Sequence, residues 1–159
     1  MTSEIDIYAG GPYPSGELSN FNKRPFRLFG CDINSTEGFL QGLRFKNPKR
    51  QREIFLMHGG KAKRTGRTEK IENHMLYFQG RPIHRMSEHY YRLVHLAFVT
   101  MARNNPEFCK ALLATGNKKL RHSIGGTDPL KTILTESEFC SILNDIRERL
   151  TKRGENVNS

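Results

Sequence analysis

The chain contains no tryptophan and only three cysteines, Cys31, Cys109 and Cys140, in 159 residues. An odd number of cysteines, with no CxxC pair and no Cys/His spacing typical of zinc, argues against a disulfide scaffold and a structural zinc site. No apolar run approaches the ~20 residues that would span a bilayer. The amino terminus lacks the basic and apolar regions of a secretory signal. These absences predict a reduced, cytoplasmic protein of one domain, with no membrane partner.

Acidic residues are outnumbered by basic ones, with 16 Asp and Glu against 26 Lys and Arg, for a net charge of +10. The excess is concentrated between Arg44 and Lys70, where ten basic and two acidic residues give a net charge of +8. Such a basic stretch favours an anionic partner: nucleic acid, a nucleotide or a phosphorylated sugar. The plainer interpretation is the solvated face of a helix and its following loop.

The hydrophobic pattern predicts a mainly α-helical domain after a short extended start. Residues 5–8 alternate like a strand, and a small hairpin is expected around Gly30. Residues 60–84 are expected to form a basic, polar connection with room for local structure around residues 75–78, and 154–159 a disordered tail. The predicted fold class is therefore mainly α with a small N-terminal β element, in a single compact domain over residues 1–153. Helices are expected over residues 36–46, 49–58, 86–103, 105–116 and from Thr135 onward.

Conventional catalytic signatures such as GxSxG, HExxH and GxxxxGK[ST] are absent from the sequence. One predicted helix is more informative. Glu37 and Gln41 are four residues apart and Arg44 follows three residues later, so the three polar groups share one face. Gly38 and Gly42 would let another backbone or a ligand approach closely, at ~1 kcal/mol each relative to alanine. An amphipathic helix with an intrahelical Glu–Gln bond would explain the same polar residues.

Short motifs follow one another in a fixed order along most of the chain. They are LSNF (18–21), RPF (24–26), STEGFLQ (35–41) with RF (44–45), AKRTGR (62–67) and LLATG (112–116). In this order they resemble the NADAR (YbiA-like) family, and the resemblance extends roughly from Gly16 to Leu150.

The resemblance implies a mainly α-helical, YbiA-like domain with N-glycosidase activity. Members of the family cleave the C–N bond between a ribose and a base. Some act on phosphorylated intermediates of riboflavin biosynthesis, and others remove ADP-ribose from modified guanine in nucleic acid. The implied partner is therefore a phosphorylated ribosyl or ADP-ribose substrate, with ADP-ribosylated nucleic acid as one form of it.

The resemblance also implies a site. The family's glutamate falls on Glu37 and its C-terminal aspartate on Asp128, which are the expected catalytic residues. A carboxylate stabilises the oxocarbenium-like centre of ribosyl C–N cleavage while a second group activates water, and arginine holds phosphate bidentately. This scheme needs no metal and no cofactor. The expected substrate-binding residues are Asn20, Phe21, Gln41, Arg44, Lys63, Gly66 and Arg67.

The chain departs from the family pattern at several positions. Gly38-Phe39 replaces His-Tyr, Arg121-His122 stands where the family often has Val-Glu, and the family's tryptophans are missing. Asp128 has a second interpretation as a turn residue in Gly-Gly-Thr-Asp-Pro. The candidates to stack on a base in place of tryptophan are Phe39, Tyr77, Tyr90 and Tyr91.

Three functions are therefore open: an active N-glycosidase, a binding module without turnover, and a nucleic-acid-binding protein that shares only the fold. The missing tryptophans favour the binding module, and the basic stretch favours the nucleic-acid-binding protein. A nucleic-acid-binding protein should lose affinity for plain DNA or RNA steeply as salt rises. An active N-glycosidase should instead recognise the ribosyl adduct. The leaving base and the oligomeric state are not specified by the sequence.

Overall fold

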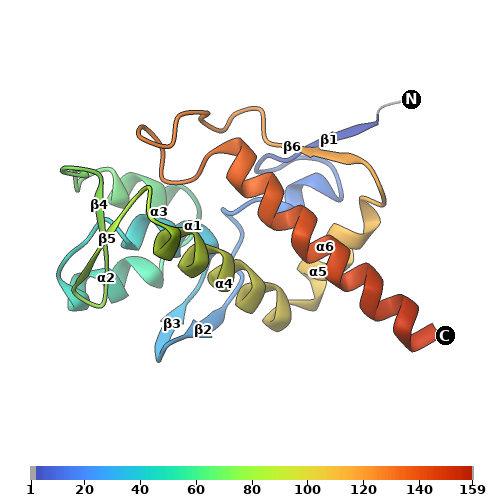
Figure 1. Cartoon of the computed structure of the whole chain (residues 1–159), viewed down its shortest axis with the longest axis horizontal. Coiled ribbons are helices and arrows are strands. Elements are labelled where there is room, and N and C mark those ends of the chain that lie inside the picture. Colours follow the sequence, from blue (N-terminus) through green and yellow to red (C-terminus); the bar gives the residue numbers. More distant parts are fainter. Residues whose placement is uncertain (1–2, 159) are drawn as a thin grey trace.

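A computed structural model of the chain describes residues 3–158, with side chains over 3–154. Its fold is mainly α-helical with short strands, as predicted, and forms a single compact domain (Figure 1). In chain order the elements are β1 (Glu4–Asp6), a 3-10 helix η1 (Ser15–Leu18), β2 (Phe26–Leu28), β3 (Cys31–Ile33), α1 (Thr36–Gly42), α2 (Pro48–Phe55), α3 (Gly59–Gly66), β4 (Met75–Phe78), β5 (Arg81–His84), α4 (Glu88–Asn104), α5 (Pro106–Ala114), β6 (Lys119–Arg121) and α6 (Glu136–Asn158).

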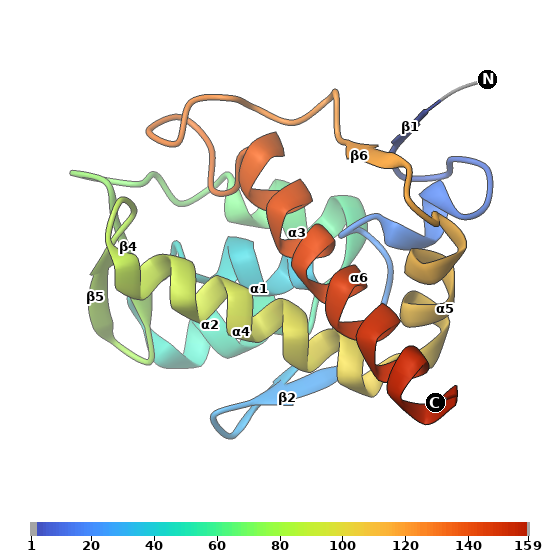
Figure 2. The same ribbon diagram turned by 45° about the vertical axis from the view of Figure 1, so that its right-hand side comes forward.

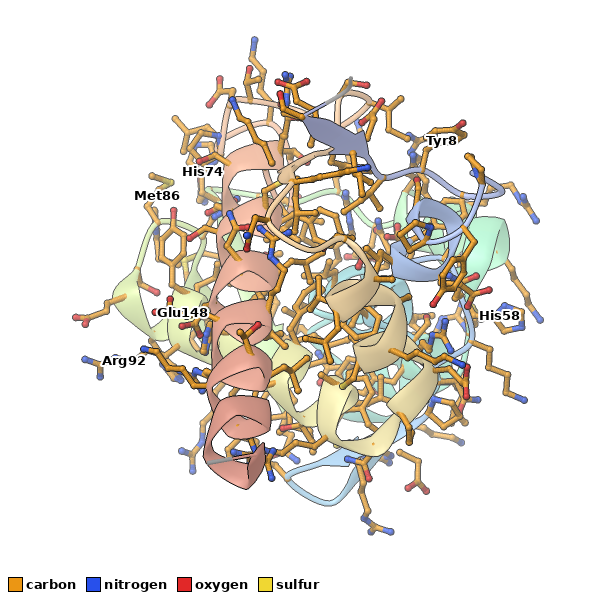
Figure 3. All side chains as sticks on the ribbon, turned by 90° about the vertical axis from the view of Figure 1, so that its right-hand side faces the viewer. Tyr8, His58, His74, Met86, Arg92 and Glu148 are labelled. Carbon is orange, nitrogen blue, oxygen red and sulfur yellow. The ribbon has the colours of Figure 1, made fainter. Side chains whose placement is uncertain are left out.

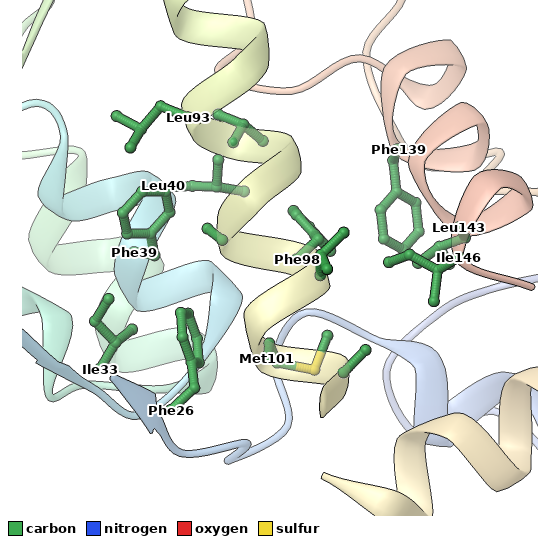
Figure 4. Packing of buried hydrophobic residues seen from close by; sticks show 14 of the residues in the cluster. Phe26, Ile33, Phe39, Leu40, Leu93, Phe98, Met101, Phe139, Leu143 and Ile146 are labelled. Carbon is green, nitrogen blue, oxygen red and sulfur yellow. The ribbon is translucent and has the colours of Figure 1, made fainter. Parts of the chain in front are cut away.

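Helix α4 is the central element of the core. Ser87 caps it by accepting a hydrogen bond from the backbone N–H of Tyr90 at 3.2 Å. Figure 4 shows α4 between α1 and α6, with Phe98 on the side of Phe139 and Leu143. Burying each of these side chains contributes about 1.5–3 kcal/mol. The predicted helical period of α4 is confirmed, except that Met86 precedes the helix and is 43% exposed.

The strands form three two-stranded pairs within the described residues. The predicted hairpin around Gly30 is confirmed as β2–β3. Strand β1 pairs in parallel with β6, so the start of the chain lies beside a segment more than a hundred residues away. Strand β6 was not predicted, because its partner β1 lies at the other end of the sequence.

The expectation that most of residues 60–84 form a polar connection was wrong, whereas the local structure expected around residues 75–78 is confirmed as β4. This segment contains α3 and the β4–β5 hairpin. The hairpin turns through Gln79 and Gly80, whose φ angles are 52° and 84°. Two consecutive positive φ angles suit a tight hairpin turn, which Asn-Gly signals far more strongly than Gln-Gly. Leu76 and Ile83 are buried on one face of this hairpin.

Three predicted helix ends differ from those observed. Helix α1 ends at Gly42 because the chain then leaves it through i→i−3 turns, and Asn47 starts the next helix by accepting hydrogen bonds from two backbone N–H groups. Gly59 begins α3 and does not close α2. Helix α6 continues past Gly154 to Asn158, where a disordered tail was predicted. No proline interrupts it, and extending an existing helix is easier than starting one. Ser159 lies outside the described residues.

The connection between β6 and α6 arches over the upper part of the molecule (Figures 1 and 2). Arg85 anchors it by donating from Nε to the carbonyl of Thr132 at 3.0 Å. The Tyr90 hydroxyl donates to the carbonyl of Ile133. Arg85 also forms a bidentate ion pair with Glu138 of α6, at 2.6 and 3.2 Å. The arch is therefore fixed to the helical core. Along residues 3–158, no helix has the length and apolarity needed to cross a bilayer.

Candidate functional site

The amino end of α1 holds the best candidate for a functional carboxyl group. Ser35 caps the helix by accepting from the Gly38 N–H at 2.8 Å. The Glu37 N–H donates to the carbonyl of Asn20 at 3.2 Å. The Thr36 hydroxyl donates to Asn20 Oδ1 at 2.9 Å. These bonds attach the loop that carries the LSNF motif to the first turn of α1, and so place Asn20 beside Glu37.

Two glycines, Gly38 and Gly42, let α1 approach its neighbours closely. A Cβ at Gly38 would lie 2.5 Å from the carbonyl oxygen of Met57, and one at Gly42 would lie 2.5 Å from the ring of Phe55. The prediction that another backbone approaches this face is thus confirmed at Gly38, and at Gly42 the close neighbour is an aromatic ring. Both glycines serve the packing of α1 on α2 and the turn that follows it.

Glu37 lies in a cavity of about 200 Å³, which we call the Glu37 pocket. Helices α1 and α3, the LSNF loop and the arch before α6 form its walls. Five residues predicted from the sequence line it together: Asn20, Phe21, Glu37, Gln41 and Lys63. The arch adds His122, Ile124, Gly125, Gly126, Thr132 and Ile133.

The Glu37 carboxyl group is nearly covered, with 9% of the residue exposed. Gln41 donates from Nε2 to Glu37 Oε1 at 3.0 Å, so the Glu–Gln bond considered above is present. Burial raises the pKa of Glu37, whereas the Gln41 hydrogen bond and the positive charges of Lys63 and Arg44 act in the opposite direction. A buried carboxyl with a raised pKa in a cavity is typical of functional sites.

His122 also lines the pocket and was not predicted as a site residue. Its ring Nδ1 lies 2.7 Å from the carbonyl oxygen of Ile7. Because a carbonyl only accepts, Nδ1 carries the hydrogen, which leaves Nε2 able to take up or release a proton. The ring packs edge-on against Phe139, with centroids 5.1 Å apart. The only sequence signal was the departure from the family pattern at residues 121–122.

Four predicted site residues do not line the Glu37 pocket. Gly66 is buried under Gln41, and Arg67 is exposed after the end of α3. Arg44 follows the end of α1 and is half-buried, and its Nη1 donates to the carbonyl of Glu69 at 3.3 Å. Asp128 is exposed, and its Oδ1 accepts from the Leu130 N–H at 2.9 Å. This geometry favours the turn interpretation of Asp128.

None of the four aromatic residues proposed for base stacking lines the Glu37 pocket. Phe39 and Tyr90 are fully buried in the core. Tyr77 and Tyr91 do not line the Glu37 pocket either. The aromatic groups at the pocket are Phe21, with Lys63 Nζ 5.8 Å from its ring centre, and Phe139.

Three larger hollows are present: two of about 910 and 770 Å³ lie along α4, α5 and α6, and one of about 650 Å³ lies beside β6 and α6. Tyr90 and Tyr91, two of the base-stacking candidates, line the 770 Å³ hollow, but none of the predicted catalytic and substrate-binding residues lines any of these hollows. Within the described part of the chain, His, Cys, Asp and Glu side chains do not gather in threes as a metal-binding group would. The predicted catalytic and substrate-binding residues therefore converge on the smaller Glu37 pocket, around its buried carboxyl group.

Comparison with known proteins agrees with this architecture. A family described as bacteriophage protein GP30.3 matches residues 12–148. An uncharacterized 17.1 kDa protein from the Gp30–rIII intergenic region of Enterobacteria phage T4 is 38% identical over 151 residues, which cover 93% of this chain and 99% of that protein. The NMR structure of the E. coli protein YbiA matches with a TM-score of 0.64 and 19% identity, over 97% of this chain and 89% of that one.

Proposed function

Since the chain belongs to the bacteriophage protein GP30.3 family and has the fold of YbiA, we propose that it is an N-glycosidase that hydrolyses a ribosyl C–N bond. The sequence resemblance to YbiA-like NADAR proteins is confirmed by the family match and the fold. The activity itself is our proposal, and the substrate is a phosphorylated ribosyl or ADP-ribose compound.

The observation that carries this proposal is the buried Glu37 carboxyl, held by Gln41 in a cavity that also contains His122. Ribosyl C–N cleavage develops positive charge at the anomeric carbon, and an oriented carboxylate in a site of low dielectric stabilises that charge. A second group is needed to move the proton of the attacking water. His122 supplies such a group within the same cavity, whereas Asp128 does not lie there.

In the proposed reaction, water adds to C1 of the ribose as the C–N bond breaks, and the bonding electrons leave with the base. Glu37 stabilises the oxocarbenium-like ribose, and His122 Nε2 takes the proton from water and returns it to the leaving base. Asn20 hydrogen-bonds a ribose hydroxyl, and Lys63 offers a positive charge to a substrate phosphate. Phe21 offers an aromatic face to the base.

The experiment is a survey of product release by mass spectrometry. The protein is incubated with guanine-ADP-ribosylated DNA, with phosphorylated ribosylamino-pyrimidines and with free ADP-ribose. We expect release of the base or the ADP-ribosyl group from one substrate class, which names that class. A folded protein that releases no product from any of them would contradict the proposal and favour a binding module without turnover.

A second candidate function is binding to nucleic acid through the basic stretch. Its side chains on and around α2 and α3 are exposed, and α3 also carries Lys63 into the Glu37 pocket. A nucleic acid bound on this surface would therefore pass close to the pocket, which makes ADP-ribosylated nucleic acid the preferred substrate form. Affinity for plain DNA that falls steeply with salt, without any product release, would favour binding alone. The exposed basic residues are Lys46, Lys49, Arg50, Arg52, Lys61, Arg64, Arg67 and Lys70.

A further inference from the structure

The hollow of about 910 Å³ lies between α5 and the second half of α6, with the end of α4 below it. We call it the α5–α6 groove. The two helices lie side by side on the face that Figure 3 turns toward the viewer, and the end of α6 projects past the rest of the domain (Figure 1). The groove is separate from the Glu37 pocket, since the two share no lining residue. The proposed hydrolysis therefore leaves it without a role.

The two walls of the groove have the same helical spacing. Each helix contributes four lining residues at positions i, i+3, i+4 and i+7, which share one face of a helix. At 1.5 Å per residue, each stripe runs for about 10 Å along its helix axis. The wall residues are Pro106, Cys109, Lys110 and Leu113 on α5, and Ile146, Arg149, Leu150 and Arg153 on α6.

The floor of the groove is apolar and partly open to solvent. Val99 and Ile146 are buried at its base, and Leu150 is half-buried beside them. Leu113, on the last turn of α5, is 45% exposed. Large apolar side chains exposed together within a concave surface are typical of interaction sites. The groove therefore offers a contact for an apolar face.

The rim of the groove carries charge of one sign. Its four basic side chains, Arg103, Lys110, Arg149 and Arg153, are exposed, and no carboxylate is among the described residues that line the groove. Arg149 is paired with Asp145 at 3.1 Å, outside the lining. Basic groups around an apolar floor concentrate positive potential there and favour an occupant with acidic flanks.

We propose that the α5–α6 groove binds an amphipathic α-helix of a partner protein, with an apolar face flanked by acidic residues. A groove between two helices receives such a helix through side chains at i, i+3, i+4 and i+7. A second copy of this chain is disfavoured as the occupant, because its net charge of +10 opposes the basic rim. A lipid surface is disfavoured because it is flat, whereas the apolar residues here line a hollow.

The test is a fluorescence anisotropy titration with a labelled synthetic peptide of about 18 residues, long enough to form a helix. The peptide has leucines on one helical face and glutamates elsewhere. A second peptide has lysines in place of the glutamates, and a third has glutamines in place of the leucines. We expect one saturable site for the first peptide and much weaker binding of the other two.

Variants locate the binding site. Leu113→Asp should weaken binding of the acidic amphipathic peptide about tenfold, or ~1.4 kcal/mol, and Lys110→Glu about fivefold. Both side chains are exposed, and circular dichroism verifies that the variants are folded. The matched controls are Leu56→Asp, at a leucine that is 50% exposed on another face, and Arg52→Glu, in the basic stretch. Both should bind the peptide as the wild type does.

Several results would overturn the inference. One is the absence of saturable binding of the acidic amphipathic peptide to the wild type. Another is equal affinity of Leu113→Asp and the wild type. Equal weakening by the control variants, or equally tight binding of the glutamine peptide, would assign the binding to general surface charge. Binding to anionic phospholipid vesicles, or dimers in sedimentation, that Leu113→Asp abolishes without any peptide binding would assign the groove to a membrane or to a second copy. None of these readouts depends on hydrolysis of a ribosyl bond.

Discussion

Gly66 of α3 lies directly against the side chain of Gln41 of α1, so that a Cβ at position 66 would come within 2.7 Å of both Cβ and Cδ of Gln41. Gln41 in turn donates to the Glu37 carboxylate at 3.0 Å. The backbone of α3 therefore fixes the amide that orients the buried carboxyl group. Gly66 therefore contributes to the site indirectly, because the absence of a side chain at position 66 leaves the space that Gln41 occupies.

Replacing Gly66 by alanine should destabilise the protein by about 1–3 kcal/mol, because the added methyl group overpacks the α1–α3 contact. It should also lower activity by displacing Gln41. Denaturant unfolding measures the first effect. Gly154→Ala, at an exposed helical position with no neighbour within 4 Å, is the control and should be neutral or slightly stabilising. Equal midpoints for Gly66→Ala and the wild type would refute the close contact.

Glu37→Gln should raise the free energy of unfolding at pH 7. Burial raises the pKa of Glu37 above its unfolded value of 4.5, so the folded state holds the ionised form less favourably than the unfolded state does. This penalty is absent below the unfolded pKa and grows as the pH rises through the folded pKa. The stability advantage of Glu37→Gln should therefore appear at neutral pH and vanish below about pH 4, in the range of the unperturbed glutamate pKa. A variant that is less stable than the wild type at pH 7 would contradict the assignment.

Gln51 is a buried polar hub that joins α2 to α1 and to the β4–β5 hairpin. Its Nε2 donates to the carbonyls of Gly42 and Tyr77 at 3.0 and 2.8 Å, and its Oε1 accepts from the Gln79 N–H at 3.0 Å. Gln51→Leu leaves these buried groups unpaired and should cost about 3 kcal/mol, since each costs roughly 1–3 kcal/mol. Thermal and denaturant unfolding measure the loss, with the exposed Arg52→Gln as the matched control. A loss of stability no larger than that of Arg52→Gln would show that the Gln51 hydrogen bonds contribute little to the free energy of unfolding.

His122→Gln should lower kcat by about 10²–10⁴-fold, the usual contribution of a general acid–base group. Glutamine retains a donor for the carbonyl of Ile7 but cannot shuttle the proton. KM should change little, because His122 acts on water and the leaving base. Steady-state kinetics on the substrate identified by the survey separates the two constants. His58→Gln, at an exposed histidine (Figure 3), is the control. An unchanged kcat in His122→Gln would remove His122 from the mechanism.

Local signals in the sequence predicted the helices well. Three of the expected helices begin at local start signals: Ser35 caps α1, Pro106 opens α5, and Thr135 and Glu138 form a capping box at α6, with both of its hydrogen bonds present. The β1–β6 pair was missed because its register joins Glu4 to Lys119, which no local pattern encodes.

The grouping of several candidate residues around one cavity was also predictable, whereas their roles stay predictions. Asn20, Phe21, Gln41 and Lys63 come together around Glu37, as the motif resemblance implied. His122 was not predicted because it reaches the pocket only through the parallel β1–β6 pairing and the arch that follows β6. The role of Asp128 was expected from the resemblance alone, and its carboxylate accepts from the Leu130 N–H in a turn outside the Glu37 pocket.

The most direct test of the central claim compares the wild type with Glu37→Gln on guanine-ADP-ribosylated DNA and on phosphorylated ribosylamino-pyrimidines. Circular dichroism first establishes that both proteins are folded, and Glu69→Gln, at an exposed carboxylate, serves as the matched control. Mass spectrometry then follows the loss of the ribosyl or ADP-ribosyl mass with time. We predict product from the wild type and Glu69→Gln on one of these substrates and none from Glu37→Gln. Equal rates from the wild type and Glu37→Gln, or no product from the folded wild type, would contradict the account.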